Sequence, residues 1–475
     1  MLLLFAKRWN SMRRPTIYAA VACLAALLAP FATAAQTPPP SFTACADAAA
    51  HTPLAGSECL LAQVPLRHEA PDAGTINLFV RRLPTPDQTK RRGEVWLIAG
   101  GPGEAGASLY PMISTYQHAF PGYDLIIPDH RGTGRSTRLC PVQEAPQSAD
   151  GVGLAGAEWG PCIGALYADS QRTKAFTITE AAQDLALLIR QQRRKGKVLL
   201  YGVSYGTQLA LRTLQVAPVP LDGLVLDGLV PPETAVQWDL SHRTTVVDAV
   251  GRALLDDAHT ATYRGVLDRM DTASWREQIP GKDLRRFLGM LLNFPTLRDR
   301  IPAIIDGLAR DDATLLTASI ADLQTALAAM GQGGENQPAL PLVMLIAASE
   351  NNARPTLTHE TVAAEAKDAL FVSPIPGLLV DAGLPTYPRD AWFGRSPATL
   401  PRTLIIHGTL DPNTPDAGAQ AHAALLKTAG PVTFSIVERG AHLLAFAAPA
   451  CFAGVVAEFV EHRKVAGRCR EPGDR

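Results

Sequence analysis

The chain has 475 residues, of which 47% are hydrophobic and 19% are charged, and its formal net charge is −1. The composition is typical of a globular protein, and the length allows one to three domains. Because the charge is nearly balanced, the chain offers no broad basic field for nucleic acid or for an anionic membrane surface. The composition therefore favours a neutral or small partner.

Residues 1–34 have the pattern of a secretory signal peptide. Basic residues precede an apolar run over 17–31, and Ala32-Thr33-Ala34 fits a small-x-small cleavage site. The apolar run is short for a membrane span. We expect cleavage after Ala34 and a secreted or periplasmic mature protein with no stable membrane association; an uncleaved anchor is the alternative.

The cysteines predict disulfides. The chain has seven, and loss of Cys23 with the signal peptide leaves an even number, which indicates disulfide bonding in an exported protein. The rest form three couples that are close in sequence, and we expect the bonds Cys45–Cys59, Cys140–Cys162 and Cys451–Cys469. No C-x-x-C or H-x-x-x-H spacing supports a metal site, and nothing in the sequence implies a cofactor.

The first elements in chain order alternate between strands and helices. Short apolar runs are typical of buried strands, and they predict strands over 61–65, 75–82, 94–99, 123–128, 198–201 and 224–226. Thr177 and Glu180 form a capping-box pattern that begins a helix, and Gly196 ends it. This alternation predicts an α/β fold with a mostly parallel central sheet and helices on both faces.

The pattern changes between residues 231 and 394, where the periodicity is helical and strand signals are sparse. Strands resume over 403–406 and 433–437, with helices near 417–428 and 452–463. The helical stretch therefore interrupts the sheet as an insertion. We predict a core in two parts and a helical cap between them, with the boundaries 35–230, 231–394 and 395–475.

Residues 202–206 read Gly-Val-Ser-Tyr-Gly, a G-x-S-x-G pattern. It follows a predicted strand and precedes a helical stretch, which is the context of a nucleophile elbow. The flanking glycines give the tight turn room, and the turn lifts the Ser204 hydroxyl out of the sheet. A chance match is the alternative in a chain with 38 glycines, but the strand–turn–helix context favours Ser204 as the nucleophile.

The partners of this serine should follow it in the order acid, then histidine, if the fold is that of an α/β-hydrolase. His442 lies in a loop after the last predicted strand and is the predicted base, whereas His422 and His462 lie in helical stretches and are expected on solvated faces. Asp411 follows the preceding strand and is predicted to orient His442. Asp227 is a rival acid, for which we expect a structural or substrate-facing role.

The loop after the strand at 94–99 contains Gly100-Gly101-Pro102-Gly103. In this fold that loop and the residue after the nucleophile supply the oxyanion hole, which makes the backbone N–H groups of Gly101 and Tyr205 the predicted donors. The segment also matches the dinucleotide pattern G-x-G-x-x-G. Pro102 removes one donor and Glu104 would repel a pyrophosphate, so nucleotide binding is disfavoured.

The segment Asp129-His130-Arg131-Gly132-Thr133-Gly134 follows another strand, and we expect it to form a hydrogen-bonded turn that supports its neighbours. Together with the glycine loop, the serine motif and the loops of Asp411 and His442, it resembles the proline iminopeptidase and secreted tripeptidyl aminopeptidase group of α/β-hydrolases. The resemblance covers most of the mature chain. The segment around Asp411, His442 and Cys451 resembles the C-terminal domain of the tripeptidyl aminopeptidase (TAP-like) branch.

The resemblance implies a cap over the active site, a triad and oxyanion donors at Ser204, Asp411, His442, Gly101 and Tyr205. It also implies an acidic residue that holds the substrate's free amine. Glu233, Glu350 and Glu104 are the candidates, although each alone could be a surface carboxylate. Glu104 stands where many members of the group have glycine.

These observations lead us to expect a monomeric, exported serine peptidase that needs no cofactor. It would act on short peptides near a free N-terminus, as an aminopeptidase or a tripeptidyl aminopeptidase, through an acyl-enzyme. An exported carboxylesterase or lipase with the same triad is the first alternative, and a non-catalytic binding protein is the second.

Overall fold

The computed structural model describes residues 41–49, 52–154, 156–330, 337–380 and 383–472. The predicted signal peptide lies outside the described residues. Within the described ranges, no helix is both long enough and apolar enough to cross a membrane.

A ten-stranded sheet, in the order β1-β2-β3-β5-β4-β6-β7-β8-β9-β10, forms the centre of the fold. Its strands are β1 (Thr43–Ala44), β2 (Glu58–Pro65), β3 (Thr75–Leu83), β4 (Gly93–Ile98), β5 (Tyr123–Pro128), β6 (Lys197–Val203), β7 (Gly223–Asp227), β8 (Thr403–Gly408), β9 (Val432–Glu438) and β10 (Arg468–Arg470). The pairs among β1, β2, β3 and β5 are antiparallel, and every pair from β5 to β10 is parallel. The predicted mostly parallel sheet is confirmed; the short strands β1 and β10 were not predicted.

The parallel strands end at one edge of the sheet. Val203 at the end of β6 is level with Asp227 at the end of β7, which in turn pairs with Ile406 of β8. The loops that follow these strands therefore start side by side. Because this geometry is set by the parallel pairing, residues far apart in the sequence meet above this edge.

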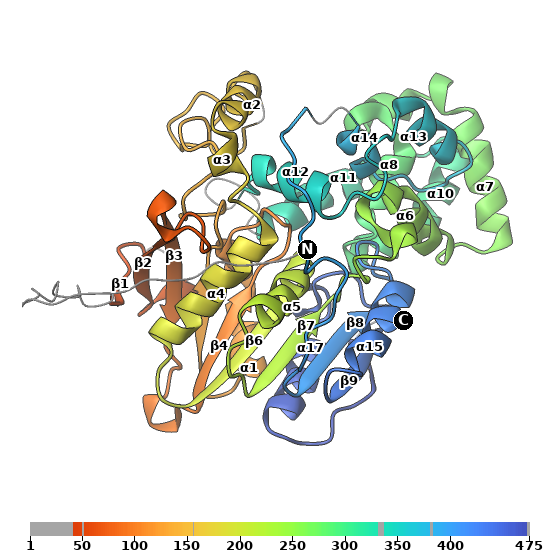
Figure 1. Cartoon of the computed structure of the whole chain (residues 1–475). Coiled ribbons are helices and arrows are strands. Elements are labelled where there is room, and N and C mark those ends of the chain that lie inside the picture. Colours follow the sequence, from red (N-terminus) through yellow and green to blue (C-terminus); the bar gives the residue numbers. More distant parts are fainter. Residues whose placement is uncertain (1–40, 50–51, 155, 331–336, 381–382, 473–475) are drawn as a thin grey trace, which may run out of the picture. The chain divides into compact units, whose positions relative to one another are not determined.

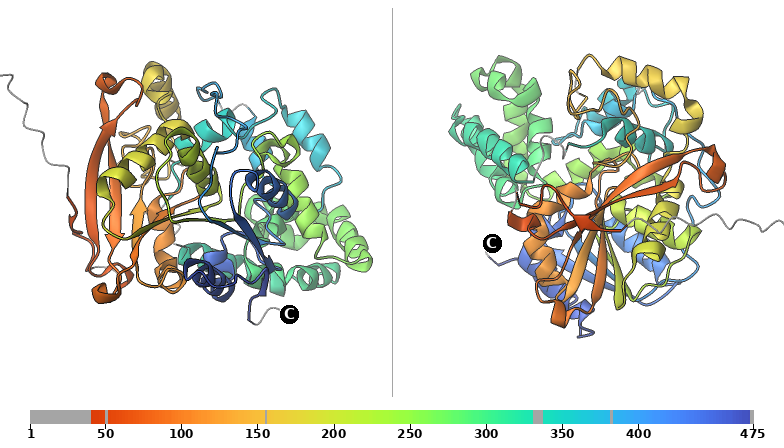
Figure 2. Two further views of the ribbon diagram at one scale, coloured as in Figure 1. Left: turned by 60° about the horizontal axis from the view of Figure 1, so that its bottom comes forward. Right: turned by 90° about the vertical axis from the view of Figure 1, so that its left-hand side faces the viewer.

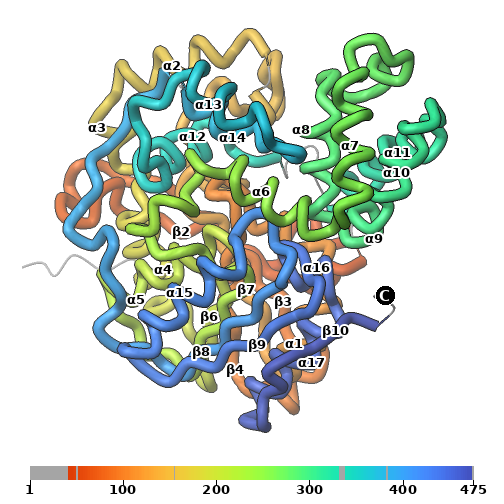
Figure 3. Tube along the Cα trace, turned by 90° about the vertical axis from the view of Figure 1, so that its right-hand side faces the viewer, coloured from red at the N-terminus to blue at the C-terminus, as the bar shows by residue number. Residues whose placement is uncertain are grey.

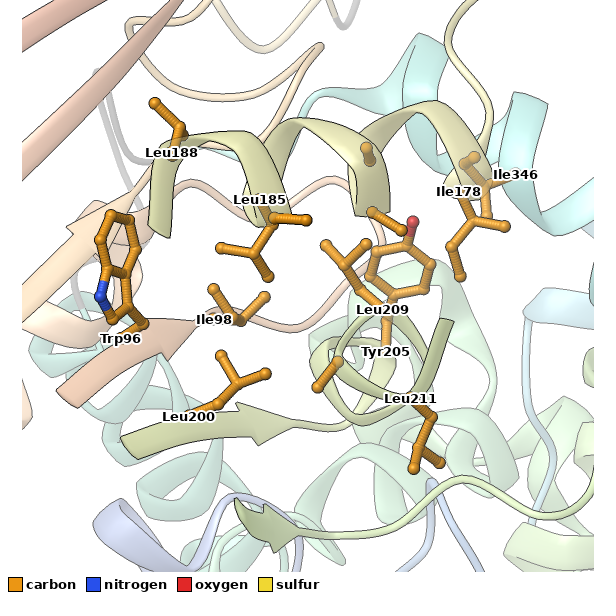
Figure 4. Close-up of a cluster of buried hydrophobic side chains, with 14 of the residues drawn as sticks. Trp96, Ile98, Ile178, Leu185, Leu188, Leu200, Tyr205, Leu209, Leu211 and Ile346 are labelled. Carbon is orange, nitrogen blue, oxygen red and sulfur yellow. The ribbon is translucent and has the colours of Figure 1, made fainter. Parts of the chain in front are cut away.

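Helices cover both faces of the sheet (Figure 1). The helices of the core are α1 (Ile113–Ala119), α4 (Ile178–Gln192), α5 (Tyr205–Val216), α15 (Asp416–Leu426), α16 (Leu444–Ala447) and α17 (Pro449–Val460). Side chains of α4, α5 and α15 share one buried cluster with the sheet, and those of α1, α16 and α17 share the other. In Figure 4, Leu185 of α4 points towards Ile98 of β4 and Leu200 of β6.

The helix α4 begins as its sequence predicts. The Thr177 side chain accepts a hydrogen bond from the backbone N–H of Glu180, which satisfies one of the free donors of the first turn. Its buried residues recur at helical spacing along the face that meets the sheet. Local capping and amphipathic spacing therefore suffice to place this helix.

The chain between β7 and β8 contains helices and, in its described part, no strand. These helices are α6 (Arg243–Arg252), α7 (Asp257–Asp268), α8 (Leu284–Leu291), α9 (Pro295–Arg298), α10 (Ile301–Ala309), α11 (Thr314–Ala329), α12 (Leu340–Ser349), α13 (His359–Ala366) and α14 (Ile375–Leu379). Figures 2 and 3 show α7, α8, α10 and α11 gathered as one group. That group has a buried cluster of its own, which includes Phe287 and Leu288 of α8 and Ile305 of α10.

The helix α12 packs differently from the rest of the insertion. Its Leu342, Leu345 and Ile346 belong to the cluster of the sheet, α4 and α5 instead. In addition, the backbone N–H of Ala339 donates to the carbonyl of Gly103, 2.9 Å away. The insertion is thus connected to the glycine loop after β4.

A second excursion, between β5 and β6, was not predicted. It contains α2 (Trp159–Ala168) and α3 (Ser170–Thr173), and its Leu154 and Leu166 share the buried cluster of α12.

The structure contains the disulfides Cys45–Cys59, Cys140–Cys162 and Cys451–Cys469, which are the three pairs expected from the sequence. The second of them ties α2 to the start of this excursion.

Candidate active site

Ser204 lies in the turn between β6 and α5, with φ 55° and ψ −126°. A non-glycine residue rarely adopts this backbone conformation, so the surrounding structure must hold it there. The neighbours explain the glycines of the motif. A Cβ atom on Gly202 would lie 2.3 Å from the carbonyl oxygen of Gly206, and one on Gly206 would lie 2.5 Å from that of Ile98. The strained turn therefore requires glycine on both sides of the serine.

His442 and Asp411 meet as the chain order predicts. The Nδ1 atom of His442 lies 2.7 Å from Oδ2 of Asp411. Asp411 is buried and is held by its own loop, because its carboxylate also accepts from the backbone N–H of Asn413, the N–H of Thr414 and the Thr414 hydroxyl. The loop after β8 therefore fixes the Asp411 carboxylate, and this carboxylate in turn orients the His442 imidazole.

The charges of this pair are strongly coupled. A carboxylate only accepts hydrogen bonds, so Nδ1 of His442 donates and Nε2 is left as an acceptor. Burial alone would lower the pKa of His442, but the Asp411 carboxylate outweighs it and raises that pKa. Burial opposes ionisation of Asp411 too, yet His442 holds the pKa of this acid below its usual range. The arrangement suits a base that becomes an ion pair when it takes a proton.

Ser204 and His442 line the same cavity, and no hydrogen bond joins their side chains among the described residues. Gly228 packs closely against the imidazole, because a Cβ atom at this position would lie 3.1 Å from two ring atoms of His442. Asp227, the rival acid, has a structural role instead: it is fully buried and accepts from the Tyr201 hydroxyl and from the backbone N–H of Leu444.

The two predicted oxyanion donors lie beside the serine. Gly101 and Tyr205 line a cavity together with Ser204, and neither backbone N–H donates to any group in the described part of the chain. Gly101 has a φ of 110°, a conformation that favours glycine. Both N–H groups are therefore available for a substrate carbonyl.

Two cavities adjoin Ser204. The larger, of about 410 Å³, is lined mainly by apolar side chains of the inserted helices, such as Met290, Leu327 and Val343. The smaller, of about 80 Å³, is lined by polar and aromatic groups that include Glu233, Trp238 and Glu350. The insertion therefore forms an apolar wall on one side of the serine and an acidic one on the other.

The three candidate acids are divided between these cavities. Glu233 and Glu350 line the small one, and Glu104 lines the large one with Ser204 and His442. Burial raises the pKa of Glu104, although the positive charge of His442 opposes this. Glu104 is thus not positioned with the other two acids.

Glu350 and Glu233 differ in the hydrogen bonds that their carboxylate oxygens accept. Glu233 accepts from Arg212, Gln208 and the backbone N–H of Gly394. Glu350 is only 3% exposed, and its Oε2 has no hydrogen-bond partner among the described residues. Burial raises the pKa of Glu350 to about 7; Arg212 and the neighbouring Tyr387 hydroxyl oppose this shift, and Glu233 adds to it. Glu350 is therefore the acid with unused capacity for a cation.

Several observations differ from the sequence-based expectations or extend them. His422 is buried in α15, within hydrogen-bond distance of the carbonyl of Val230, so the expectation of a solvated face was wrong. His462 is exposed, just after the end of α17. The turn at Asp129 is hydrogen-bonded as expected, because this carboxylate accepts from the N–H groups of Gly106 and Arg135. Arg243, which lines both cavities, was missed because it lies in the insertion outside any motif.

Comparison with known proteins agrees with this geometry at the level of the fold. Residues 95–261 match the family described as alpha/beta hydrolase fold, and no curated protein matches the chain. Similar solved structures include a proline iminopeptidase of Mycobacterium smegmatis (16% identity, TM-score 0.40, 85% of this chain and 98% of that one). Others are an esterase from Thermogutta terrifontis (16%, 0.37, 82% and 95%) and an epoxide hydrolase from Vigna radiata (14%, 0.37, 82% and 95%).

The family match begins within β4 and ends within α7, and it includes the glycine loop and the turn at Ser204. Outside the matched residues, the strand order and the parallel pairing of β8 with β7 and of β9 with β8 continue the central sheet. On this evidence the chain has the α/β-hydrolase fold.

Proposed function

We propose that the protein is an exported serine hydrolase that cleaves short peptides near a free N-terminus. The observation that carries the proposal is Glu350, a buried carboxylate in the wall of a cavity that Ser204 also lines; one of its oxygens accepts no hydrogen bond from any described residue. An ammonium group is the natural partner for such a carboxylate. The free amine of a peptide would bind there, and its carbonyl would lie over Ser204.

The reaction would proceed by acyl transfer to water. His442 takes the proton of the Ser204 hydroxyl at Nε2 while the serine oxygen attacks the carbonyl carbon. The N–H groups of Gly101 and Tyr205 stabilise the oxyanion. The imidazolium, held by Asp411, then protonates the leaving amine, and water attacks the acyl-enzyme with His442 again as the base.

Export is supported by two observations. The N-terminal pattern is that of a signal peptide, and the three disulfides need an oxidising compartment to form and persist. We propose a secreted or periplasmic location and a monomeric protein. We also propose that it acts on small substrates, because residues of the insertion line both cavities beside Ser204.

A carboxylesterase or lipase is the second candidate. The observation that favours it is the apolar cavity of about 410 Å³, which Ser204 and His442 both line. Such a space suits an acyl or alkyl chain as well as an apolar side chain of a peptide. The two candidates differ in whether Glu350 binds a substrate ammonium.

A substrate panel separates them. The mature protein is tested on unblocked aminoacyl and tripeptidyl anilides, on their N-acetylated forms and on simple esters. The peptidase proposal expects release from the unblocked anilides only, lost in Ser204→Ala and kept in Ser274→Ala, a matched change at an exposed serine. Equal hydrolysis of blocked and unblocked anilides would refute it, and activity on esters alone would favour the esterase.

A further inference from the structure

Arg243 is a buried guanidinium at the meeting point of the two cavities. It is the first residue of α6, it is 8% exposed, and it lines both the apolar cavity and the acidic one. Its Nη1 donates to Oδ1 of Asn413, 3.0 Å away, and to the carbonyl of Pro412, 3.3 Å away. The side chain therefore reaches from the insertion to the loop that carries Asp411.

The other two nitrogen atoms of the guanidinium, Nε and Nη2, make no such contacts with the described residues. Among the residues that the structure describes, neither the buried Nε nor Nη2 has a hydrogen-bond partner. No carboxylate of the described residues lies within ion-pair distance of Arg243. The two acids whose charge reaches it are Asp411 and Asp239. Asp411 is paired with His442, and Asp239 accepts from the N–H groups of Ser241 and Ala353.

The charge persists despite burial. Burial lowers the pKa of Arg243 to about 10, with Asp411 and Asp239 opposing the change, so the group is a cation at neutral pH. A buried cation without a counter-ion is costly for a folded protein. The planar guanidinium presents two donors in a geometry that matches a carboxylate. These are the properties of a binding site for an anionic group.

We propose that Arg243 binds a carboxylate of the substrate where the two cavities meet, beside Ser204. The inference rests on the proposed function and extends it. With the amine of the substrate at Glu350 and a carboxylate at Arg243, the preferred substrates are short zwitterionic peptides whose C-terminal carboxylate lies close to the scissile bond. The apolar cavity then receives a side chain of such a peptide.

The first experiment compares Leu-Leu with its C-terminal amide. The wild-type protein should have a KM for the free acid about 10- to 100-fold below that for the amide, the range that a charge-assisted hydrogen bond provides. Arg243→Met should bring this ratio close to one, and Arg243→Lys should restore part of it. The matched control is Arg252→Met on the same helix, whose guanidinium donates to Asp248 and to the carbonyl of Asp368; it should keep the wild-type ratio.

A purely structural role for Arg243 predicts a different result. If it only supports the loop of Asp411, then Arg243→Met lowers kcat for the acid and the amide alike and leaves their ratio unchanged, which would overturn the proposal. Equal KM values of the wild-type protein for acid and amide would overturn it without any variant.

A binding experiment separates this inference from the peptidase proposal. Calorimetry with the Ser204→Ala protein compares 4-methylpentanoate with 4-methylpentanamide, neither of which carries an amine for Glu350. Tighter binding of the carboxylate that is lost in Ser204→Ala/Arg243→Met supports the anion site even if no peptide is cleaved. Equal binding of the two probes, together with no preference between the peptide acid and amide, refutes the anion site.

Discussion

Replacing Glu350 with Gln should make the protein more stable and less active on its substrate. Burial raises the pKa of Glu350 from 4.5 to about 7, and this difference corresponds to about 3 kcal/mol. The unfolded chain, with the lower pKa, loses this proton first as the pH rises. Ionised Glu350 therefore makes the folded state less stable, with the effect growing from about pH 4.5 and complete above about pH 7.

The Gln variant keeps the shape and lacks the charge. Its advantage in unfolding free energy over the wild type should grow by about 2–3 kcal/mol between pH 5 and pH 8. Guanidinium chloride unfolding with the disulfides intact measures it. The control is Glu360→Gln, at an exposed glutamate of α13, whose effect should stay small at both pH values. An advantage of Glu350→Gln that is the same at pH 5 and pH 8 would refute the reasoning.

The activity of the same variant should change in the opposite direction. Loss of the carboxylate–ammonium contact should lower kcat/KM for unblocked substrates about 10- to 100-fold and leave simple esters unaffected. In the wild type, kcat/KM for unblocked substrates should rise with pH as Glu350 ionises near pH 7 and as His442, whose pKa Asp411 raises, loses its proton and becomes the free base. It should fall above about pH 8, where the substrate amine loses its proton. An equal loss on esters would mean that Glu350 acts on the fold and not on the amine.

Three further predictions concern the proposed triad, the adjacent Gly228 and one of the disulfides. Asp411→Asn should lower kcat by a factor on the order of 10³–10⁴ with little change in KM, because Asn cannot hold the tautomer of His442 or stabilise its imidazolium; a loss below tenfold would contradict this role. Gly228→Ala should lower kcat with thermal stability reduced as well, since its Cβ would lie 3.1 Å from the His442 ring and φ is +59°; full activity would show that the ring has room to move. Replacing Cys140 and Cys162 with Ser should lower the unfolding free energy by about 3 kcal/mol, measured by denaturant unfolding, and an unchanged midpoint would argue against that bond as a constraint.

The features that the sequence predicted best depend on local rules. The G-x-S-x-G spacing follows from a turn so tight that a Cβ on Gly202 or Gly206 would meet backbone atoms. Asp411 and His442 were found by chain order, because parallel strands end at one edge and the loops after them must meet there. The two cysteines of each disulfide are close in sequence, so the pairs could be predicted from their spacing along the chain.

The features that it missed depend on packing between distant segments. Glu350 was one of several plausible carboxylates, and only the structure shows that its Oε2 is buried and has no hydrogen-bond partner in the described ranges. Arg243 carries no motif, and its position between two cavities depends on how the insertion packs on the core. The helix α2 was missed because its ten residues include Gly160, Pro161 and Gly164, which usually indicate a loop, and because its apolar residues show little helical periodicity.

The arrangement of the disulfides has a consequence for the behaviour of the protein in solution. An exposed sheet edge is a template for pairing with another chain. Both outermost strands of this sheet are short, and each is next to a disulfide: β1 precedes Cys45, which is bonded to Cys59 of β2, and β10 contains Cys469, which is bonded to Cys451. Reduction would free these strands and uncover the longer β2 and β9. A chain kept in a reducing compartment should therefore aggregate through its sheet edges.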